Sequence, residues 1–320
     1  MILLIDAYNL IIRNYVKNPH LNEDGENIGA VASTITSLYF LIKKFSPKQI
    51  YLCFEGKNSG SRRRRSFHDY KDGRKAPHTI KNYSQSNLNS NFWWCINKVV
   101  ELIEFLPICI LSKDNLEADD IISFICKNFK NKEITIVSTD KDYYQLINKN
   151  ISVYSPIKNV LYNYENFLET FKILPVNWLI FKAISGDSSD NIAKIPLRIG
   201  IKTLLKKFPE LSKNKFDITS FIELTKTKDN KIFDNYIDLL TSNYDLMNLI
   251  ENKQLSWINE KALKLQIADF EPKFDSINFD MMSHKYGIGY NFSQNEFSFL
   301  FKRLRNEFTS EKSNIREIWQ

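Results

Sequence analysis

The sequence predicts an α/β fold: a mostly parallel sheet flanked by helices in the first part of the chain, followed by a helical second part. Three short runs rich in β-branched or aromatic residues, at 2–5, 49–54 and 133–137, have the character of buried strands. Stretches with helical spacing lie between them, at 28–45, 92–106 and 118–129. Strands that alternate with helices in this way favour a parallel sheet. Helical patterns with short connections then follow, at 178–185, 202–208 and 233–250.

Composition narrows the class of protein. The 320 residues are 43% hydrophobic and 13% aromatic, which is enough for one large core or two modest ones. Lys and Arg number 44 against 37 Asp and Glu, and the net charge of +7 favours a polyanionic partner such as nucleic acid. A basic enzyme without such a partner is equally compatible with the charge alone.

Cysteine spacing and hydropathy bear on the compartment. The four cysteines show no C-x-x-C spacing and are interpreted as reduced core residues. No segment approaches the roughly 18 uninterrupted apolar residues of a membrane helix, and the first residues do not form a signal peptide. We therefore expect a cytoplasmic protein.

The segment 57–91 interrupts the alternation of strands and helices. It has little apolar periodicity and is crowded with Lys, Arg, Ser and Asn, so it cannot bury a face of its own. A segment of this length without a core is typically a functional loop or a disordered one. Its charge favours a lid that contacts nucleic acid, with a solvated loop as the alternative. The candidate contacts include Arg62, Arg63, Arg64 and Arg65.

Acidic residues recur where the predicted elements begin or end. They are Asp6, Glu55, Glu117, Asp119, Asp120, Asp140, Asp142, Asp187 and Asp190. Acids at helix N-termini often serve only as caps. Here, however, Asp6, Glu55 and Asp140 follow the three predicted strands, and the ligand site of a parallel sheet lies beyond the carboxyl ends of its strands.

Crowded carboxylates need protons or cations to relieve their repulsion. Hard divalent ions such as Mg²⁺ prefer oxygen ligands, and two of them about 4 Å apart suit phosphodiester hydrolysis. The sequence shows no phosphate-binding loop and no nucleophile elbow, and its four histidines lack zinc-ligand spacing. Phosphoryl chemistry with metal ions is therefore the prediction.

Four motifs carry a family resemblance. They are LLIDAYNLIIR at 3–13, LEADDII at 116–122, STDKDYYQL at 138–146 and GDSSDNI at 186–192. In this order and spacing they resemble the 5′ nuclease family, which includes flap endonucleases, phage 5′-to-3′ exonucleases with RNase H activity and the 5′ nuclease domains of bacterial DNA polymerases. The resemblance covers roughly residues 1–210 and implies a PIN-like nuclease core.

The resemblance implies a site with two Mg²⁺ ions, for which Mn²⁺ can substitute. Asp6, Glu55, Glu117 and Asp119 would lie nearer one ion. Asp140, Asp142, Asp187 and Asp190 would lie nearer the other, and Asp120 would lie between the two or support them from behind.

It also implies contacts to nucleic acid. The basic insertion, at about 57–95, corresponds to an arch over the active site. DYKDGRK at 69–75 is similar to the arch segment of phage members, which makes Lys71 and Arg74 contacts to the scissile phosphate. Arg13 matches a family phosphate contact, although it could equally lie on the surface without that role. The segment 195–208 looks like the family's helix-turn-helix that grips duplex backbone, with Gly200, Lys202 and Thr203 at the phosphate; a plain turn between packed helices is the alternative.

The sequence departs from the family pattern in two places. Glu55 stands where relatives usually have Asp; its longer side chain could still reach a metal, with a different geometry and rate. The turn at 197–200 has one glycine and one extra residue, so a potassium ion at the helix-turn-helix remains an open alternative.

We therefore expect a structure-specific 5′ nuclease that leaves a 5′-phosphate and acts in replication or repair, as a monomer in a bacterial or phage-infected cytoplasm. Its expected substrates are DNA with a 5′ flap, a nick or a 5′ single-stranded end, and RNA–DNA hybrids. A single-strand-binding protein or a polymerase would be its protein partner. The expected domains are a core at 1–174, a helical duplex-binding region at 175–305 and a flexible tail at 306–320. The alternatives are a non-catalytic nucleic-acid-binding replication scaffold and a small PIN-type ribonuclease.

Overall fold

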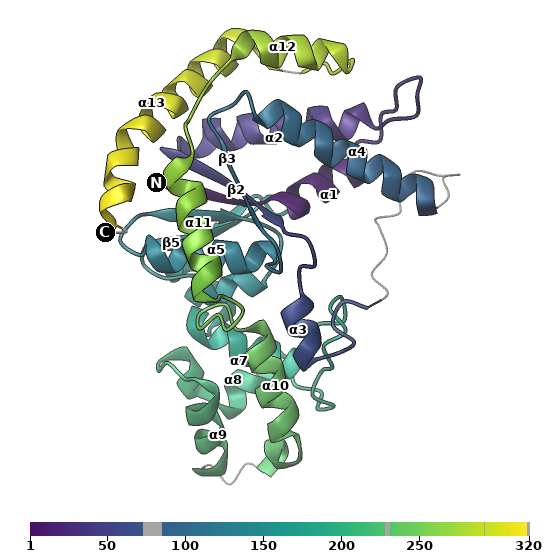
Figure 1. Cartoon of the computed structure of the whole chain (residues 1–320). Helices are drawn as coiled ribbons and strands as arrows, with labels where there is room; N and C mark the ends of the chain where they lie inside the picture. Colours follow the sequence, from purple (N-terminus) through teal and green to yellow (C-terminus); the bar gives the residue numbers. More distant parts are fainter. Residues whose placement is uncertain (73–84, 228–230, 291, 319–320) are drawn as a thin grey trace. The chain divides into compact units, whose positions relative to one another are not determined.

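The computed structural model describes residues 1–72, 85–227, 231–290 and 292–318, with only the backbone described at 85–89, 231 and 313–318 (Figure 1). The chain divides into two compact units. The first comprises Met1–Phe54, Lys75–Ser112 and Lys261–Gln320, and the second comprises Glu55–Arg74 and Lys113–Glu260. Each unit is therefore assembled from segments that are far apart in the sequence.

The first unit contains the opening strands. β1 (Ile2–Asp6) pairs in parallel with β2 (Gln49–Glu55), and the register runs from Ile2 opposite Gln49 to Asp6 opposite Cys53. β3 (Cys109–Lys113) follows β2 in the strand order. Both β1 and β2 are buried along nearly their whole length, as expected for parallel strands that are covered on both faces.

Helices of the first unit begin at polar caps. The Asp6 side chain accepts a hydrogen bond from the Asn9 amide at 3.1 Å at the start of α1, and the Asn27 side chain accepts one from Ala30 at 3.0 Å at the start of α2. α11 begins in the second unit and continues into the first. The helices are α1 (Ala7–Lys17), α2 (Ile28–Phe45), α4 (Gln85–Ile103), α11 (Trp257–Asp269), α12 (Ser276–Lys285) and α13 (Gln294–Ile318).

Helix α2 is long and apolar enough to cross a membrane, and is the one such helix in the described part of the chain. Its buried residues, among them Val31, Ile35, Leu38 and Ile42, recur at helical spacing. α2 packs against α1 and α4 (Figure 1). Core helices commonly have the same composition, so its length and apolar character do not by themselves indicate a membrane span.

The second unit has the strand order β4-β5-β6. β4 (Ile134–Val137) and β5 (Ile151–Ser155) are parallel, whereas β6 (Val160–Tyr162) returns antiparallel to β5. Its α-helices are α3 (Ser61–Ser66), α5 (Ala118–Asn128), α6 (Tyr164–Phe171), α7 (Trp178–Ser185), α8 (Ile201–Lys207), α9 (Ile218–Thr227) and α10 (Ile237–Met247). Four short 3₁₀ helices join them: η1 (Asp142–Leu146), η2 (Pro175–Asn177), η3 (Pro209–Ser212) and η4 (Lys231–Tyr236).

An aromatic cluster packs β6, η1, α6 and α7 together. Phe167 is fully buried at its centre, with ring centroids 5.3 Å from Tyr144, 4.7 Å from Phe171 and 5.5 Å from Trp178. The tilted and edge-on ring geometries are those that aromatic pairs prefer. This cluster holds η1, which carries part of the candidate site described below.

The predicted α/β fold with a mostly parallel sheet and flanking helices is confirmed. The three predicted strands and the six predicted helical stretches are all present, but α4 begins at Gln85 where the prediction began at 92, and the stretch predicted at 233–250 consists of η4 and α10. β3, β5 and β6 were not predicted. Residues 306–318, expected to be a flexible tail, lie in α13. The other domain boundaries and the helix-turn-helix stay predictions.

The aromatic cluster makes a stability prediction. Phe167→Ala removes a fully buried ring, and we expect it to lower the free energy of unfolding by about 3–5 kcal/mol, because the lost burial and the resulting cavity both destabilise the core. Ile157→Ala is the matched control, since Ile157 is 71% exposed and its truncation is expected to cost less than about 0.5 kcal/mol. Urea denaturation followed by circular dichroism measures both. Equal effects of the two substitutions would contradict the packing described here.

Candidate metal centre

The motif LEADDII places three carboxylates at the start of α5. Glu117 is the N-cap residue, and the Asp120 side chain accepts a hydrogen bond from the Glu117 amide at 3.0 Å. Ligand oxygens of Glu117, Asp119 and Asp120 all lie within 4.8 Å of one another. A capping arrangement that is common at helix starts thus gathers three acids in one place.

The Arg63 guanidinium lies among these three carboxylates. It donates to Asp120 through two nitrogens, at 2.8 and 3.1 Å, and to Asp119 at 3.4 Å, and it also pairs with Glu117. Its side chain is only 2% exposed. Burial disfavours its charge, but the three carboxylates outweigh burial and raise the pKa of Arg63 above its usual value. The Arg63 Nε also donates to the Leu246 carbonyl at 3.2 Å.

Lys71 and Tyr70 bring the GDSSDNI loop to the same place. Lys71 Nζ lies 2.5 Å from Glu117 Oε1 and 4.0 Å from Asp190 Oδ2. The Tyr70 hydroxyl donates to Glu117 at 2.8 Å and to Asp190 at 3.4 Å. The Lys71 amide donates to the Asp190 carbonyl at 3.2 Å. We call Glu117, Asp119, Asp120 and Asp190 the first acidic cluster.

A second acidic cluster consists of Asp140, Asp142 and Asp187. Lys182 Nζ joins two of them, at 2.8 Å from Asp142 Oδ1 and 2.9 Å from Asp187 Oδ2. The Asp142 amide donates to Asp140 Oδ1 at 2.9 Å. Asp187 Oδ1 also accepts hydrogen bonds from the Ser189 hydroxyl at 2.6 Å and the Ser189 amide at 2.9 Å. Two separate motifs of the sequence therefore meet through one lysine.

The protonation equilibria of this cluster reflect crowding. Burial and the neighbouring Asp140 charge raise the pKa of Asp142 to about 7, in spite of Lys182. Burial also raises the pKa of Asp187, but the hydrogen bonds from Ser189 and Lys182 outweigh it and leave that pKa below its usual value. In the first cluster, burial raises the pKa of Asp119 well above its usual range.

Glycine is required at the start of the GDSSDNI turn. Gly186 has a φ of 63°, and a Cβ there would lie 2.5 Å from the Lys194 amide nitrogen. The tight turn lets the Asp187 amide donate to the Ile192 carbonyl at 2.9 Å while the Ile192 amide donates back at 2.8 Å. The backbone of Asp187 is thereby fixed beside Lys182.

Carboxylates outnumber cationic side chains in both clusters. Counted over the described residues, the first has four carboxylates against Arg63 and Lys71, and the second has three against Lys182, which is a formal excess of two negative charges in each. The donors are oxygens, which hard divalent cations prefer. In the described part of the chain, Asp119 Oδ1 is buried without a hydrogen-bond partner. The residues present therefore fit a divalent cation.

The remaining predicted ligands lie at element ends. Glu55 ends β2 and accepts a hydrogen bond from the Ser59 hydroxyl at 2.9 Å. Asp6 ends β1 in the first unit, where it caps α1. Asp190 shares Lys71 and Tyr70 with Glu117, whereas Asp187, three residues earlier, shares Lys182 with Asp142.

The residues expected to contact nucleic acid have diverse surroundings. Arg62 donates to the Gln254 carbonyl, and Arg64 donates to the Ser59 carbonyl at 2.8 Å, while Arg65 is exposed. Arg13 is half-buried on α1, Gly200 is the N-cap of α8, and Lys202 and Thr203 are exposed. Arg74 lies outside the described residues.

Arg63 does not fit the expectation of a nucleic-acid contact. Its side chain is buried and its donors face the carboxylates and the Leu246 carbonyl. A run of four arginines suggests a solvated face, but the first turn of α3 directs one of them inward.

Four side chains that support the site are not predicted from the sequence: Tyr70, Lys182, Gln145 and Asn252. Lys182 precedes the GDSSDNI turn on α7, and Tyr70 precedes Lys71, so adjacency to a recognised motif was the available signal. Asn252 had no such signal, because it lies in a segment without a motif. Its amide nitrogen donates to Asp120 Oδ1 at 2.9 Å and to the Ser123 hydroxyl at 2.8 Å.

From the surroundings of Arg63 we predict how its substitution changes the free energy of unfolding with and without a divalent metal ion. Arg63→Gln leaves the first cluster short of a buried counter-charge, and we expect a loss of about 3–5 kcal/mol in unfolding free energy in chelator-treated protein. Because a divalent ion supplies positive charge to the same carboxylates, Mn²⁺ should restore part of that loss. Arg64→Gln, an exposed neighbour, is the control and should change stability by less than about 0.5 kcal/mol. Urea denaturation with and without Mn²⁺ measures these effects. No difference between the two variants would count against a structural role for Arg63.

Comparisons with known proteins identify the family of the chain. The family model of the 5′-3′ exonuclease N-terminal resolvase-like domain matches residues 1–172. The chain is 33% identical over 217 residues to a 5′-3′ exonuclease of Buchnera aphidicola subsp. Schizaphis graminum, covering 66% of this chain and 71% of that protein. It is 32% identical over 238 residues to a 5′-3′ exonuclease of Mycoplasmopsis pulmonis, covering 72% and 75%.

Solved structures share the fold. The bacteriophage T5 D15 protein, co-crystallised with metal ions, aligns with a TM-score of 0.61 at 18% identity over 96% of this chain and 99% of that one. The D15 flap endonuclease in a complex with DNA and metal ions aligns at 0.63, also at 18% identity and with the same coverage. Human GEN1 in complex with Holliday junction DNA aligns at 0.57 and 12% identity, over 96% and 72%. On the match of the family model and the identity to curated relatives, this chain belongs to the 5′-3′ exonuclease family.

Proposed function

We propose that the chain hydrolyses phosphodiester bonds near the 5′ end of a nucleic-acid strand, with two divalent cations, in DNA replication or repair. The observation that carries the proposal is the pair of acidic clusters, each with an excess of negative charge, in a member of the 5′-3′ exonuclease family. Each cluster supplies oxygen donors and an incompletely compensated charge for one cation.

The proposal assigns the ligands by cluster. Glu117 and Asp119, with Asp6 and Glu55, would hold one Mg²⁺, for which Mn²⁺ can substitute. The residues that would hold the other are Asp140, Asp142, Asp187 and Asp190. When bound, the metal pair supplies a hydroxide and stabilises the leaving oxygen. Asp120 supports the first group from behind, because Arg63, the Glu117 amide and Asn252 occupy its oxygens.

Lys71 is the proposed contact to the scissile phosphate. Its side chain is 15% exposed and bonds to Glu117 of the first cluster, which is itself only 2% exposed. An ammonium there can rotate toward a bound phosphate and offset the charge that develops as the bond breaks. Arg74, outside the described residues, is proposed to share this role. The buried Arg63 keeps the carboxylates in place and does not reach the substrate.

The proposed substrates are DNA with a 5′ flap, a nick or a 5′ single-stranded end, and RNA annealed to DNA. The net charge of +7 and the exposed Lys202 and Thr203 after Gly200 support a grip on duplex backbone, with Arg13 as a further phosphate contact. A grip of this kind responds to shape and charge, with little readout of base sequence, so affinity should fall steeply as salt rises. The enzyme would act as a monomer in the cytoplasm.

A non-catalytic replication scaffold and a small PIN-type ribonuclease are not favoured. The family relatives are exonucleases, and no carboxylate of the predicted set is missing from the sequence. Purified protein that binds a 5′-flap DNA but leaves it uncut with Mg²⁺ or Mn²⁺ would favour the scaffold instead.

Asp140→Ala tests the ligand assignment. Loss of this oxygen should lower the cleavage rate of a 5′-labelled flap by about 10²- to 10³-fold or more, because the second cluster then holds its cation poorly. Binding of the same flap in Ca²⁺, followed by gel shift, should be preserved. Asp245→Ala is the control, since Asp245 is an exposed partner of Lys253. Near-normal cutting by Asp140→Ala would remove Asp140 from the proposed ligands.

Lys71→Ala tests the phosphate contact. We expect a fall of about 10²-fold in single-turnover cleavage, because the cation that offsets transition-state charge is lost. Lys57→Ala, an exposed lysine of the same basic insertion, should cut at close to the normal rate. The two rates are compared at saturating enzyme, so that substrate binding does not enter. Equal rates for both variants would argue that Lys71 contributes only to surface charge.

A further inference from the structure

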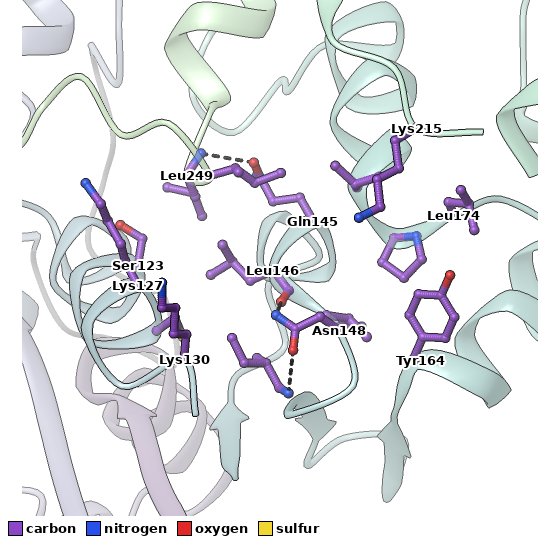
Figure 2. Close-up of a pocket in the computed structure, with 16 residues that line it drawn as sticks. Ser123, Lys127, Lys130, Gln145, Leu146, Asn148, Tyr164, Leu174, Lys215 and Leu249 are labelled. Atoms are coloured by element: carbon purple, nitrogen blue, oxygen red, sulfur yellow. Dashed lines mark hydrogen bonds between the residues drawn. The ribbon is translucent and has the colours of Figure 1, made fainter. Parts of the chain in front are cut away.

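A cavity of about 380 Å³ lies within the second unit, apart from the acidic clusters. It is formed by the middle and end of α5, the end of η1, the η2 region and the segment after α10 (Figure 2). On α5 the acids occupy the first turn, whereas Lys127 lies about 10–15 Å further along the helix axis and Lys130 follows the end of the helix. The cavity is therefore a separate feature from the site proposed for hydrolysis.

The wall of the cavity is mainly aliphatic. Leu146, Leu174 and Leu249 line it (Figure 2). Val176 and Ile250 also belong to the lining. A cavity of roughly 150 Å³ lined by such side chains is known to hold benzene. The larger volume here has room for two bulky apolar side chains of a ligand.

Three lysines, Lys127, Lys130 and Lys215, also line this cavity. All three are exposed, and no carboxylate belongs to the lining. Among the described residues, the one carboxylate at ion-pair distance from Lys127 is Glu260, at 3.9 Å. Within the described part of the chain, no carboxylate lies at ion-pair distance from Lys130 or Lys215. The mouth is thus positively charged around an apolar interior.

We propose that this cavity is the docking site for an acidic peptide segment of a partner protein that carries bulky apolar side chains. The apolar side chains fill the cavity, and neighbouring carboxylates of the peptide pair with Lys130 and Lys215. The combination of an aliphatic interior and a cationic rim is complementary to such a segment and to few others.

The lining favours a peptide over nucleic acid. Single strands are bound by flat aromatic faces that stack on bases and by arginines. This cavity has no arginine, and Tyr164 is its one aromatic residue. A concave aliphatic surface suits the side chains of Leu, Ile or Phe instead.

A peptide docked in this cavity would leave the acidic clusters accessible. It would contact residues that hydrogen-bond to the backbone of those clusters. Gln145 lines the cavity and donates to the Asp142 carbonyl at 2.9 Å, while its Oε1 accepts from the Leu249 amide at 3.0 Å. Ser123, also in the lining, donates to the Asp120 carbonyl at 2.9 Å. A bound peptide therefore tethers the enzyme to its partner without covering the carboxylates.

Fluorescence anisotropy of a fluorescein-labelled peptide, Asp-Asp-Asp-Asp-Leu-Phe, tests the proposal with the full-length protein. We expect saturable binding that is at least tenfold weaker when Ala-Ala replaces Leu-Phe. The double variant Lys130→Glu/Lys215→Glu should weaken binding at least tenfold. Lys226→Glu, an exposed lysine of α9, is the matched control and should bind as the unchanged protein does. If Lys226→Glu weakened binding equally, the effect would come from the net charge of the protein, and the proposed docking site would be wrong.

Two further variants address the apolar interior. Val176→Trp fills the cavity, and Ile250→Asp places a charge at a position that is 38% exposed and therefore tolerates it in the fold. Both should lower peptide affinity at least tenfold while the thermal unfolding curve of Ile250→Asp stays that of a folded protein. Unchanged affinity in Ile250→Asp would overturn the proposal. So would displacement of the peptide by a six-nucleotide oligo-dT, which would make the cavity a nucleic-acid site.

Flap cleavage serves as an independent readout, since the docking proposal does not rest on the nuclease proposal. The Lys130→Glu/Lys215→Glu variant should cut a 5′ flap at the normal rate, because neither lysine belongs to the acidic clusters. If the protein binds the peptide but does not cut the flap, the proposed nuclease function is wrong and the docking site stands. If it cuts the flap but does not bind the peptide, the docking site is wrong.

Discussion

The structure depends on one electrostatic constraint: seven carboxylates of the second unit lie in two clusters, and among the described residues three cationic side chains pair with them. Buried like charges cannot all ionise without counter-charge. Arg63, Lys71 and Lys182 supply part of it, and burial together with the Asp140 charge raises the pKa of Asp142 to about 7 in spite of Lys182. If lysines and arginines neutralised every carboxylate, the site would have no excess negative charge to attract a divalent ion. Here the three cationic side chains stabilise the folded site, and the remaining negative charge favours binding of a divalent ion.

Local structure explains how acids from distant motifs reach that place. The capping geometry of α5 turns Glu117 and Asp120 toward each other, and the Gly186 turn fixes Asp187 beside Lys182. The chain beyond the family model takes part as well, since Asn252 donates to Asp120 and Leu246 accepts from Arg63. A truncation after the matched domain would therefore remove Asp187 and Asp190, and also the hydrogen bonds from Asn252 and to Leu246 that hold the first cluster.

The sequence predicts an element well where its residue types strongly favour one structure. It predicts poorly where tertiary contacts determine the structure or the direction of a side chain. Residues 2–5 read as a buried strand because four aliphatic side chains in a row leave little alternative. β5, with the sequence ISVYS, was missed because two serines interrupt its apolar pattern, and β6 is only three residues long. The acids were found by their repeated occurrence at element ends. Arg63 was misjudged because three of the four arginines in its run do point elsewhere, and nothing in a charge run marks the one that folds inward.

The two ends of α5 show how one scaffold can separate chemistry from recognition. Its first turn carries backbone amides and carboxylates, where polar groups are satisfied by Arg63 and Asn252. Its last turns carry Cys126 and Lys127 beside an aliphatic cavity. η1 repeats the pattern, with Asp142 at its start and Leu146 at its end. A short helix is rigid, so the distance between its two ends is fixed. A partner bound at the apolar end of α5 would therefore hold the acidic end at a fixed distance from itself without contacting the carboxylates. The same two elements can thus serve catalysis and docking together.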